Sequence, residues 1–308
     1  MSIIVFGSIN MDLVAHAPRL PKPGETLTGT SFHTTPGGKG ANQAVACAHL
    51  GVKTRMVGRV GGDFFGTALL ENLAAYGVDT FGVAVEEKLP SGVALIAIDE
   101  AAENNIIIVP GANGAVGLPD LKQLENILPE AKVLLLQLEI PLESVKEAAR
   151  LASAQGVTVI LDPAPARILP LDLYPSVDIL TPNTSEAAIL VGFPVETELE
   201  AQRAARILIE SGTHLVIIKM GAMGAYAQNQ SNGRFYPAIP VEAVDTVAAG
   251  DAFNGALAAA LSEGLPFEEA IYWALAGGAI AVTRAGAQTA MPDRNEILSL
   301  LKETEPRS

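Results

Sequence analysis

The stretch Asp245-Thr-Val-Ala-Ala-Gly-Asp251 has the composition of a site that handles an anionic group, and it leads into a predicted helix over residues 250–262. Its small residues allow successive backbone amides, from about Ala248 to Asp251, to form a concavity that binds an anion. Asp251 has two interpretations. It caps the helix, where free amides and the helix dipole favour a carboxylate, or it accepts the proton of a substrate hydroxyl as a phosphoryl group arrives. In the second case the concavity stabilises the charge on the transferred group.

A second stretch, Thr35-Pro-Gly-Gly-Lys-Gly-Ala-Asn-Gln43, precedes a helical run over residues 44–50. Its three glycines let the backbone approach a ligand closely, and the free amides of the helix start suit a polar or anionic group. Lys39 and Asn42 add side-chain donors. The stretch is not a Walker A loop, because His33 stands where that motif begins with glycine and because glycine follows the lysine. A plain glycine turn with a solvated lysine is the alternative.

Two further places pair a carboxamide with a carboxylate. Asn10 and Asp12 lie at the end of the predicted first strand, and their spacing of two points both side chains to one face. There they could hold sugar hydroxyls or form an Asx turn. Asn183 and Glu186 follow a predicted strand over 177–180 and are neighbours in the first turn of a helix. They form a capping box or steady a hydrated magnesium ion on nucleotide phosphates.

A weaker signal is the stretch Lys219-Met-Gly-Ala-Met-Gly224. It places two glycines directly after a predicted strand, where the backbone can pass close to an adenosine or a phosphate. The four histidines of the chain show no spacing typical of metal ligands.

Short apolar, β-branched runs bounded by turn residues predict the strands that position these stretches. Several of the runs are continuously apolar, which is typical of strands covered on both faces of a sheet. The predicted strands are residues 3–9, 54–60, 92–99, 105–109, 133–138, 157–161, 177–180 and 215–219. The predicted helices are residues 142–154, 198–210, 250–262, 267–283 and 293–302.

Helix and strand alternate from about residue 115 to residue 220, which predicts right-handed crossovers on a parallel sheet. Residues 11–35 and 90–109 interrupt this alternation, because they are strand-like with no helix between them. The second of these stretches predicts a hairpin around the polar turn 100–104. We therefore expect one α/β domain over residues 1–308, with a mostly parallel central sheet flanked by helices and a small β-sheet lid formed by the two insertions.

Composition excludes several functional classes. The chain of 308 residues is 49% hydrophobic, too apolar for a disordered protein, and its net charge of −14 disfavours nucleic-acid binding. A single cysteine, Cys47, excludes a disulfide framework and fits a reducing cytoplasm. The start of the sequence lacks the features of a signal peptide, and the apolar run 270–283 is shorter than the ~20 residues of a bilayer span. We expect a cytoplasmic protein that binds neither nucleic acid nor membrane.

Side by side, these stretches resemble the PfkB family of carbohydrate kinases, and within it the ribokinases. Pro36-Gly-Gly-Lys-Gly-Ala-Asn-Gln43 resembles the first signature of the family, and Asp245–Asp251 resembles the second. Asp162-Pro-Ala-Pro-Ala166 and the Asn183/Glu186 pair add to the match, which covers nearly the whole length. The resemblance implies a ribokinase-like fold and ATP-dependent phosphorylation of D-ribose at O5 to D-ribose 5-phosphate.

The resemblance also implies roles for individual positions. Asp251 matches the catalytic base, and the amides of Ala249, Gly250 and Asp251 match the anion hole. The sugar-binding positions are Asn10, Asp12, Gly38, Lys39, Asn42, Glu139 and Asp251, with Ala94, Ile96 and Ile108 on the sugar-facing side of the lid. The nucleotide-binding positions are Asn183, Glu186, Lys219, Met220, Gly221, Ala222, Met223, Gly224 and Gly250. The positions for an activating potassium ion, mostly through carbonyls, are Asp245, Val247, Ala281, Arg284, Gly286 and Ala290.

The implied cofactors are ATP, Mg²⁺ and K⁺, and the implied assembly is a homodimer through the lid, which would cover its strand edges. The sequence departs from the family pattern at three positions. Ala290 replaces a hydroxyl residue common at one potassium position, so side-chain coordination is lost there. Lys219 stands where a small polar residue such as Thr is frequent, so its ammonium assists at the phosphates or is merely solvated. Leu275 falls where a polar residue often meets the adenine.

Other functions are compatible with parts of this pattern. Another sugar or nucleoside kinase of the group, such as a deoxyribokinase, fructokinase or adenosine kinase, shares the signatures. A nucleoside needs a larger, aromatic-lined pocket, whereas only 5% of this chain is aromatic. A catalytically silent sugar-sensing homologue should lose the base or the anion-hole glycine, yet Asp251 and Gly250 are both present. A dehydrogenase is disfavoured because no G-x-G-x-x-G follows the first strand.

Overall fold

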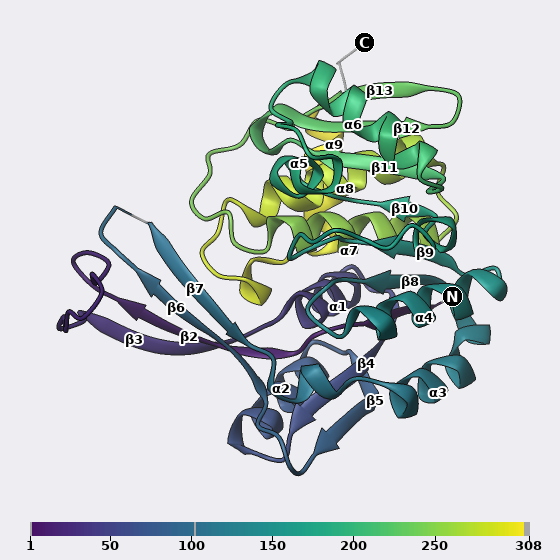
Figure 1. Cartoon of the computed structure of the whole chain (residues 1–308). Helices are drawn as coiled ribbons and strands as arrows, with labels where there is room; N and C mark the ends of the chain where they lie inside the picture. The colour runs from purple at the N-terminus through teal and green to yellow at the C-terminus, as the bar shows by residue number, and fades with distance from the viewer. Residues whose placement is uncertain (1, 102, 305–308) are drawn as a thin grey trace.

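The computed structural model describes residues 2–101 and 103–304, which form a large sheet covered by helices and a small sheet that projects from it (Figure 1). Neighbouring strands of the large sheet are parallel except at one edge, where β12 and β13 add an antiparallel hairpin. In spatial order its strands are β13 (Gly233–Pro237), β12 (Gly224–Asn229), β11 (Leu215–Lys219), β10 (Ile179–Leu180), β9 (Thr158–Leu161), β8 (Ala131–Leu136), β1 (Ser2–Phe6), β4 (Lys53–Gly61) and β5 (Asp79–Glu86).

Helices cover both faces of the large sheet, which explains its continuously apolar strands. In β1, Ile3 and Val5 pack in one hydrophobic core with α1, α7 and α8, while Ile4 and Phe6 pack in a second core with α3, α4 and α6. The helices are α1 (Lys39–His49), α2 (Phe64–Ala75), α3 (Leu118–Ile127), α4 (Leu142–Ala154), α5 (Thr184–Val191), α6 (Glu198–Glu210), α7 (Ala249–Ser262), α8 (Phe267–Ala281) and α9 (Arg294–Thr304). Short 3₁₀ turns lie at Gly111–Ala115, Leu128–Glu130, Tyr174–Ser176, Gly221–Met223 and Gln288–Ala290.

The small sheet has four strands, in the order β3 (Ser31–Gly37), β2 (Asn10–His16), β6 (Gly92–Ile98) and β7 (Asn104–Val109). The predicted hairpin is confirmed, since β6 and β7 pair antiparallel, while β2 and β6 pair in parallel. Residues 17–30 contain no strand, so only parts of the first strand-like stretch belong to this sheet. Figure 1 shows the small sheet extending away from the helical layers.

The predicted first strand is wrong at its end. β1 stops at Phe6, and Asn10 and Asp12 lie instead at the start of β2 in the small sheet. The chain turns at Gly7, where a Cβ would lie 2.0 Å from Oε1 of Gln137 and 3.0 Å from Cα of Gly40, so a larger residue would displace the Gln137 side chain. The sequence conceals the turn, because Ile9 is apolar and fully buried like the strand before it. Asn10 and Asp12 still share one face, as their spacing predicts.

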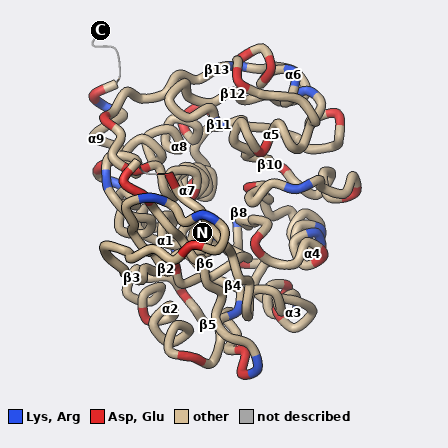
Figure 2. The backbone as a smooth tube through the Cα atoms, turned by 60° about the vertical axis from the view of Figure 1, so that its left-hand side comes forward, with Lys and Arg blue, Asp and Glu red and all other residues tan. Residues whose placement is uncertain are grey.

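Acidic and basic residues are interspersed along the backbone (Figure 2), so the net charge of −14 is spread over the chain rather than gathered in one segment. No helix within residues 2–101 and 103–304 combines the length and the apolarity that crossing a bilayer requires.

Candidate active site

Asp251 is buried in the first turn of α7, beside a helix start with free amides. Its carboxylate does not cap the helix, so that interpretation is wrong. It accepts hydrogen bonds from Nδ2 of Asn42 and Nε2 of Gln43, both at 3.0 Å. Within the described part of the chain, the backbone amides of Gly250 and Asp251 donate to no protein acceptor, and they border a pocket. Ala248, which precedes α7, holds a left-handed φ of 58°. The arrangement supplies a carboxylate and anion-binding amides at one point.

The glycine-rich stretch brings α1 against the turn after β1, so it is not a plain glycine turn. A Cβ on Gly38, whose φ is 87°, would lie 2.7 Å from the backbone nitrogen of Asn10. A Cβ on Gly40 would lie 2.6 Å from the nitrogen of Ser8. Glycine is therefore needed at both positions for α1 to approach. This contact places Lys39 and Asn42 next to Asn10 and the start of β2.

Three carboxylates gather on the sugar-binding side predicted from the sequence. Oε2 of Glu139 accepts hydrogen bonds from Oγ of Ser8 at 2.5 Å, from the backbone nitrogen of Lys39 at 3.1 Å and from Nδ2 of Asn10 at 3.5 Å. Burial, together with the charges of Glu139 and Asp251, raises the pKa of Asp12 from its ordinary 3.8 to about 7. Because the charges of Glu139 and Asp251 both raise the pKa of Asp12, the three carboxylates lie in one electrostatic environment, which suits the binding of hydroxyl groups.

The ammonium of Lys39 stands among these acids. Burial alone lowers the pKa of Lys39, but the carboxylates of Asp251, Asp162, Glu139 and Glu186 outweigh it and raise the pKa. For Asp251 the main influence is burial, which raises its pKa, whereas Lys39 and the two amide donors oppose that rise. Lys39 therefore remains a cation and favours the charged form of Asp251.

One face of the small sheet carries Asp12 together with apolar side chains of β6 and β7. Ala94 of β6 pairs with Asp12 of β2 on one side and with Ile108 of β7 on the other, so all three side chains share a face. Ile96 lies two residues along from Ala94 and shares it too. Ala94 is buried, while Ile108 is 39% exposed. The residues expected to face the sugar thus lie on the side of Asp12.

A pocket of about 590 Å³ lies on the other side of Asp251. Lys39 and Asp251 line it together with Gly250, so these residues join the pocket to the polar group described above. Nζ of Lys219 donates to Oδ1 of Asp162 at 2.8 Å, and both side chains reach the pocket. A Cβ on Gly250 would lie 3.3 Å from that Nζ, so the Lys219 ammonium stands beside the start of α7.

Some of the expected nucleotide-binding positions line the pocket, and two of them do not. Asn183 and Glu186 form the capping box of α5: Asn183 Oδ1 accepts from the Glu186 amide at 2.8 Å, and Glu186 Oε2 accepts from the Asn183 amide at 2.7 Å. Both also line the pocket, and burial raises the pKa of Glu186. Gly221, Ala222 and Gly224 line the pocket as well. In contrast, Met220 is buried in the hydrophobic core and Met223 is exposed, and neither belongs to the lining.

The segments expected to hold potassium meet at Asp245. Its carboxylate accepts hydrogen bonds from the amides of Val247 and Gly286, both at 3.0 Å, and its own amide donates to the carbonyl of Val282. The guanidinium of Arg284 is paired with Glu296, which leaves the backbone of this residue as a donor of oxygen ligands. The methyl side chain of Ala290 is fully buried and offers no oxygen. These contacts bring residues 245–247 and 282–286 together, which are two of the segments expected to hold the ion.

Several residues of this region escape the sequence predictions. Gln43 and Asp162 contact Asp251 and Lys219 directly, and the position of Asp162 after β9, at the carboxyl edge of the parallel sheet, is a usable signal. The apolar wall of the pocket comes from distant segments: Ile239, Pro240, Val241, Phe253, Leu275, Gly278, Ala279 and Val282. Only the last four have a helical spacing that marks one face of α8 and the residue after it.

Comparison with known proteins assigns the chain to a family. The model of the pfkB family carbohydrate kinases matches residues 1–294. The chain belongs to this family. The match covers both sheets and all the segments that meet at Asp251. The expected ribokinase-like fold is therefore confirmed.

Individual relatives narrow the likeness within the family. The chain is 41% identical to a ribokinase of Haemophilus influenzae over 301 residues, covering 98% of each chain. It is 38% identical to a deoxyribokinase of Salmonella typhi, covering 97% of this chain and 99% of that protein. The structure of Arabidopsis thaliana ribokinase complexed with ribose and ATP matches with a TM-score of 0.90 at 36% identity, covering 97% of this chain and 98% of that one.

Proposed function

We propose that this protein transfers the γ-phosphoryl group of ATP to O5 of D-ribose, giving D-ribose 5-phosphate and ADP. The observation that carries the proposal is the position of Asp251, which lies between a group of hydroxyl-binding side chains and a large pocket bordered by free amides. Relatives named ribokinase, one of them complexed with ribose and ATP, support the choice of both substrates. The single buried Cys47 supports a cytoplasmic location.

In the proposed reaction, Asp251 accepts the proton of the sugar hydroxyl. The freed oxygen forms a bond to the γ-phosphorus, the bond from that phosphorus to the β,γ-bridging oxygen breaks, and ADP leaves. The amides of Ala249, Gly250 and Asp251 donate to the oxygens of the transferred group, where negative charge is concentrated. Lys39 lies among the same groups and contributes a positive charge on the sugar side.

Ribose is held, in this proposal, by Asn10, Asp12, Gly38, Lys39, Asn42 and Glu139. The carboxylates of Asp12 and Glu139 accept from hydroxyls, while the amide groups and Lys39 donate to them. Ala94, Ile96 and Ile108 lie over the apolar side of the sugar ring as the small sheet closes. Closure excludes water from the attacking hydroxyl and strengthens the electrostatic contacts around it.

The residues lining the pocket fit a nucleotide and its ions. The pocket residues that bind ATP in this proposal are Asn183, Glu186, Lys219, Gly221, Ala222 and Gly224. Asn183 and Glu186 would hold a hydrated Mg²⁺ that accompanies the phosphates, and this ion would supply positive charge to neutralise them. An activating K⁺ would be held, mostly through carbonyls, by Asp245, Val247, Ala281, Arg284, Gly286 and Ala290. Asp245 supports this assignment, because its hydrogen bonds tie the segment before α7 to the segment after α8.

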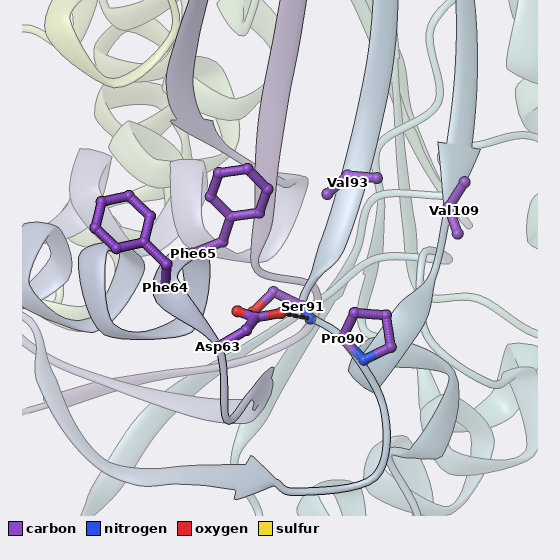
Figure 3. Close-up of a pocket in the computed structure, with 7 residues that line it drawn as sticks. All are labelled: Asp63, Phe64, Phe65, Pro90, Ser91, Val93 and Val109. Atoms are coloured by element: carbon purple, nitrogen blue, oxygen red, sulfur yellow. Dashed lines mark hydrogen bonds between the residues drawn. The ribbon is translucent and has the colours of Figure 1, made fainter.

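We further propose that the protein is a homodimer joined through the small sheet. The face opposite Asp12 is apolar and exposed, and a hollow of about 320 Å³ lies between it and the start of α2 (Figure 3). Phe64 and Phe65 line this hollow from α2, and Val93 and Val109 line it from the sheet. A second copy is the occupant with the same apolar chemistry, and it would also cover the free edges of β3 and β7.

A substrate panel tests the activity. Purified protein is given ATP and Mg²⁺ with D-ribose, 2-deoxy-D-ribose, D-fructose or adenosine, with and without K⁺, and ADP release is measured. We expect ribose to react fastest, K⁺ to raise the rate, and the product to carry its phosphate on O5 by ³¹P NMR. Faster phosphorylation of fructose or adenosine contradicts the proposal. Faster reaction of 2-deoxyribose identifies a deoxyribokinase instead, an alternative that the relative at 38% identity favours.

The first prediction concerns the base itself. Asp251→Asn keeps the shape of the side chain but removes the proton acceptor, so we expect kcat to fall by about 10²–10⁴. Asp172→Asn is the matched control, because this exposed carboxylate pairs with Lys146 at the surface, away from the pocket. A kcat for Asp251→Asn within about 10-fold of the unmodified protein would show that another group takes the proton.

A further inference from the structure

We propose that Asn72 and Gln288 are positioning residues that hold the Asn42 side chain so that it donates to Asp251. This inference rests on the proposed function, in which Asp251 is the base. Neither residue lines the nucleotide pocket within the described chain, and neither belongs to the sugar-binding positions. Asn72 lies on α2, and Gln288 lies on the 3₁₀ turn Gln288–Ala290. They act on the reaction through Asn42 alone.

A continuous chain of hydrogen bonds connects the four residues. Nδ2 of Asn72 donates to Oε1 of Gln288 at 2.6 Å, and Nε2 of Gln288 donates to Oδ1 of Asn42 at 3.1 Å. Nδ2 of Asn42 then donates to Oδ2 of Asp251 at 3.0 Å. Gln288, Asn42 and Asp251 are buried, and Asn72 is half-buried, so water competes little for these bonds.

The Asp251 carboxylate fixes which group donates and which accepts in each of these hydrogen bonds. An ionised Asp251 only accepts hydrogen bonds, so Asn42 must present its NH₂ group to it. The oxygen of Asn42 then faces Gln288, which must donate, and the oxygen of Gln288 in turn faces Asn72, which must also donate. A carboxylate at position 72 only accepts, so Gln288 must turn its NH₂ group toward it, which reverses both carboxamides. An apolar residue at position 72 makes no such demand. After the reversal, the oxygen of Asn42 faces the carboxylate, and two acceptors repel each other.

This series of hydrogen bonds orients the Asn42 side chain, which packing alone would not do. Asn42 also belongs to the sugar-binding positions, so its orientation sets both the direction of the sugar contact and the charge balance of Asp251. The amide donor is one of the groups that oppose the effect of burial on this carboxylate. Asn72, on a separate helix, thus determines the state of the base without touching the substrate.

The decisive experiment compares two replacements of similar shape at position 72. Asn72→Asp keeps an acceptor and removes the donor, whereas Asn72→Leu removes both. We expect Asn72→Asp to lower kcat with ribose about 10- to 100-fold while the KM for ATP stays within twofold, because Asn42 no longer donates to the base but the nucleotide pocket is intact. We expect Asn72→Leu to have the smaller effect, since a missing partner does not force the reversal.

Asn229→Asp is the control for the added charge, because Oδ1 of this exposed side chain only accepts from backbone amides, a role that aspartate keeps. If Asn72→Leu is as harmful as Asn72→Asp, or if Asn72→Asp keeps kcat within twofold, the proposal is wrong. If Asn72→Asp does not fold, Gln288→Glu imposes the same reversal one step closer to Asp251 and is judged against Gln288→Met by the same criterion.

A second measurement separates this proposal from the proposed function. The side-chain amide resonances of Asn42, assigned by their loss in Asn42→Asp, report its hydrogen bond to a carboxylate in ¹H–¹⁵N spectra without any turnover. We expect these resonances to shift in Asn72→Asp and to stay near their original positions in Asn229→Asp. Unshifted resonances in Asn72→Asp overturn the positioning role. A protein that shows the shift but phosphorylates no sugar overturns the proposed function and leaves the chain of amides in place.

Discussion

Asp12 shows how a binding residue can cost stability. In the folded protein, burial and the charges of Glu139 and Asp251 raise its pKa from 3.8 to about 7. Between these two pH values the folded state binds more protons than the unfolded state, so the free energy of unfolding falls as pH rises from about 4 to about 7. The unfavourable charge is therefore fully present above pH 7, where the carboxylate is needed to accept from hydroxyls.

Asp12→Asn is expected to stabilise the protein at pH 8 and to leave its stability at pH 4 nearly unchanged. Raising a pKa from 3.8 to about 7 corresponds to about 4 kcal/mol, and the partial exposure of the side chain reduces this to about 1–3 kcal/mol. Urea unfolding at the two pH values measures the difference. An equal effect at both pH values contradicts the assignment, since it would come from packing rather than from charge. The same variant should lose kcat/KM for ribose.

At the level of single residues, the sequence predicts the groups that sit in short, distinctive stretches. Lys39, Asn42 and Asp251 belong to runs of small residues that open helices, and a local argument finds them. Gln288 and Asn72 cannot be found this way, because their contacts join positions 246 and 216 residues apart. Hydrogen-bonding partners across such distances are set by the packing of α1, α2 and the turn after α8, which leaves no spacing pattern in the sequence.

The sequence predicts helices and strands most closely where the burial of their residues is uniform or strictly periodic. β8, β9 and β11 are apolar runs covered on both faces, and α4 and α6 have the predicted bounds, Leu142–Ala154 and Glu198–Glu210. β5 escapes prediction because its residues Asp79–Glu86 are mixed in polarity and only partly buried at the edge of the sheet. β13 escapes it for the same reason, because it is mostly exposed at the other edge. β12 is largely buried but contains Gly224, Ala225 and Ala227 and no β-branched residue, so its composition does not indicate a strand.

The start of α7 is the element whose geometry carries the most strain. Ala248 adopts a φ of 58°, which costs a residue with a Cβ about 1–2 kcal/mol. Glycine at this site removes that strain, but it also raises the entropy of the unfolded chain, which offsets part of the gain in stability. We expect Ala248→Gly to raise the free energy of unfolding by up to about 1 kcal/mol and to lower kcat, because the anion-binding amides become less rigid.

Ala249→Gly is the matched control for this prediction. It makes the same change one residue later, inside α7, where glycine destabilises a helix by about 0.5–1 kcal/mol. Denaturant unfolding of both variants gives the comparison. Ala248→Gly being destabilised as much as Ala249→Gly would mean that the left-handed backbone carries no strain.

For the whole molecule, the two faces of the small sheet have different tasks. On one face, Asp12 and Ala94 look toward the group of carboxylates; on the other, Phe32, Leu95 and Ile107 are 64%, 44% and 62% exposed. Successive side chains of a strand point to opposite faces of the sheet, so neighbouring residues of β7 lie on different surfaces. Exposed apolar area of this kind, continuous with the hollow at Phe64, is typical of an interface.

The homodimer is therefore tested by two adjacent substitutions. Ile107→Lys places a charge on the outer face, where it must be desolvated if two copies pack there, so we expect the mass by light scattering to fall from twice 32.0 kDa to 32.0 kDa. Ile106→Lys places the same charge one residue away on the opposite face, where the side chain is 53% exposed, and should leave the dimer intact. Dissociation by both substitutions would indicate damage to β7 rather than loss of an interface. A protein that is already monomeric before substitution would leave the outer face without the second copy proposed for it, and the small sheet would then cover the sugar without help from a partner.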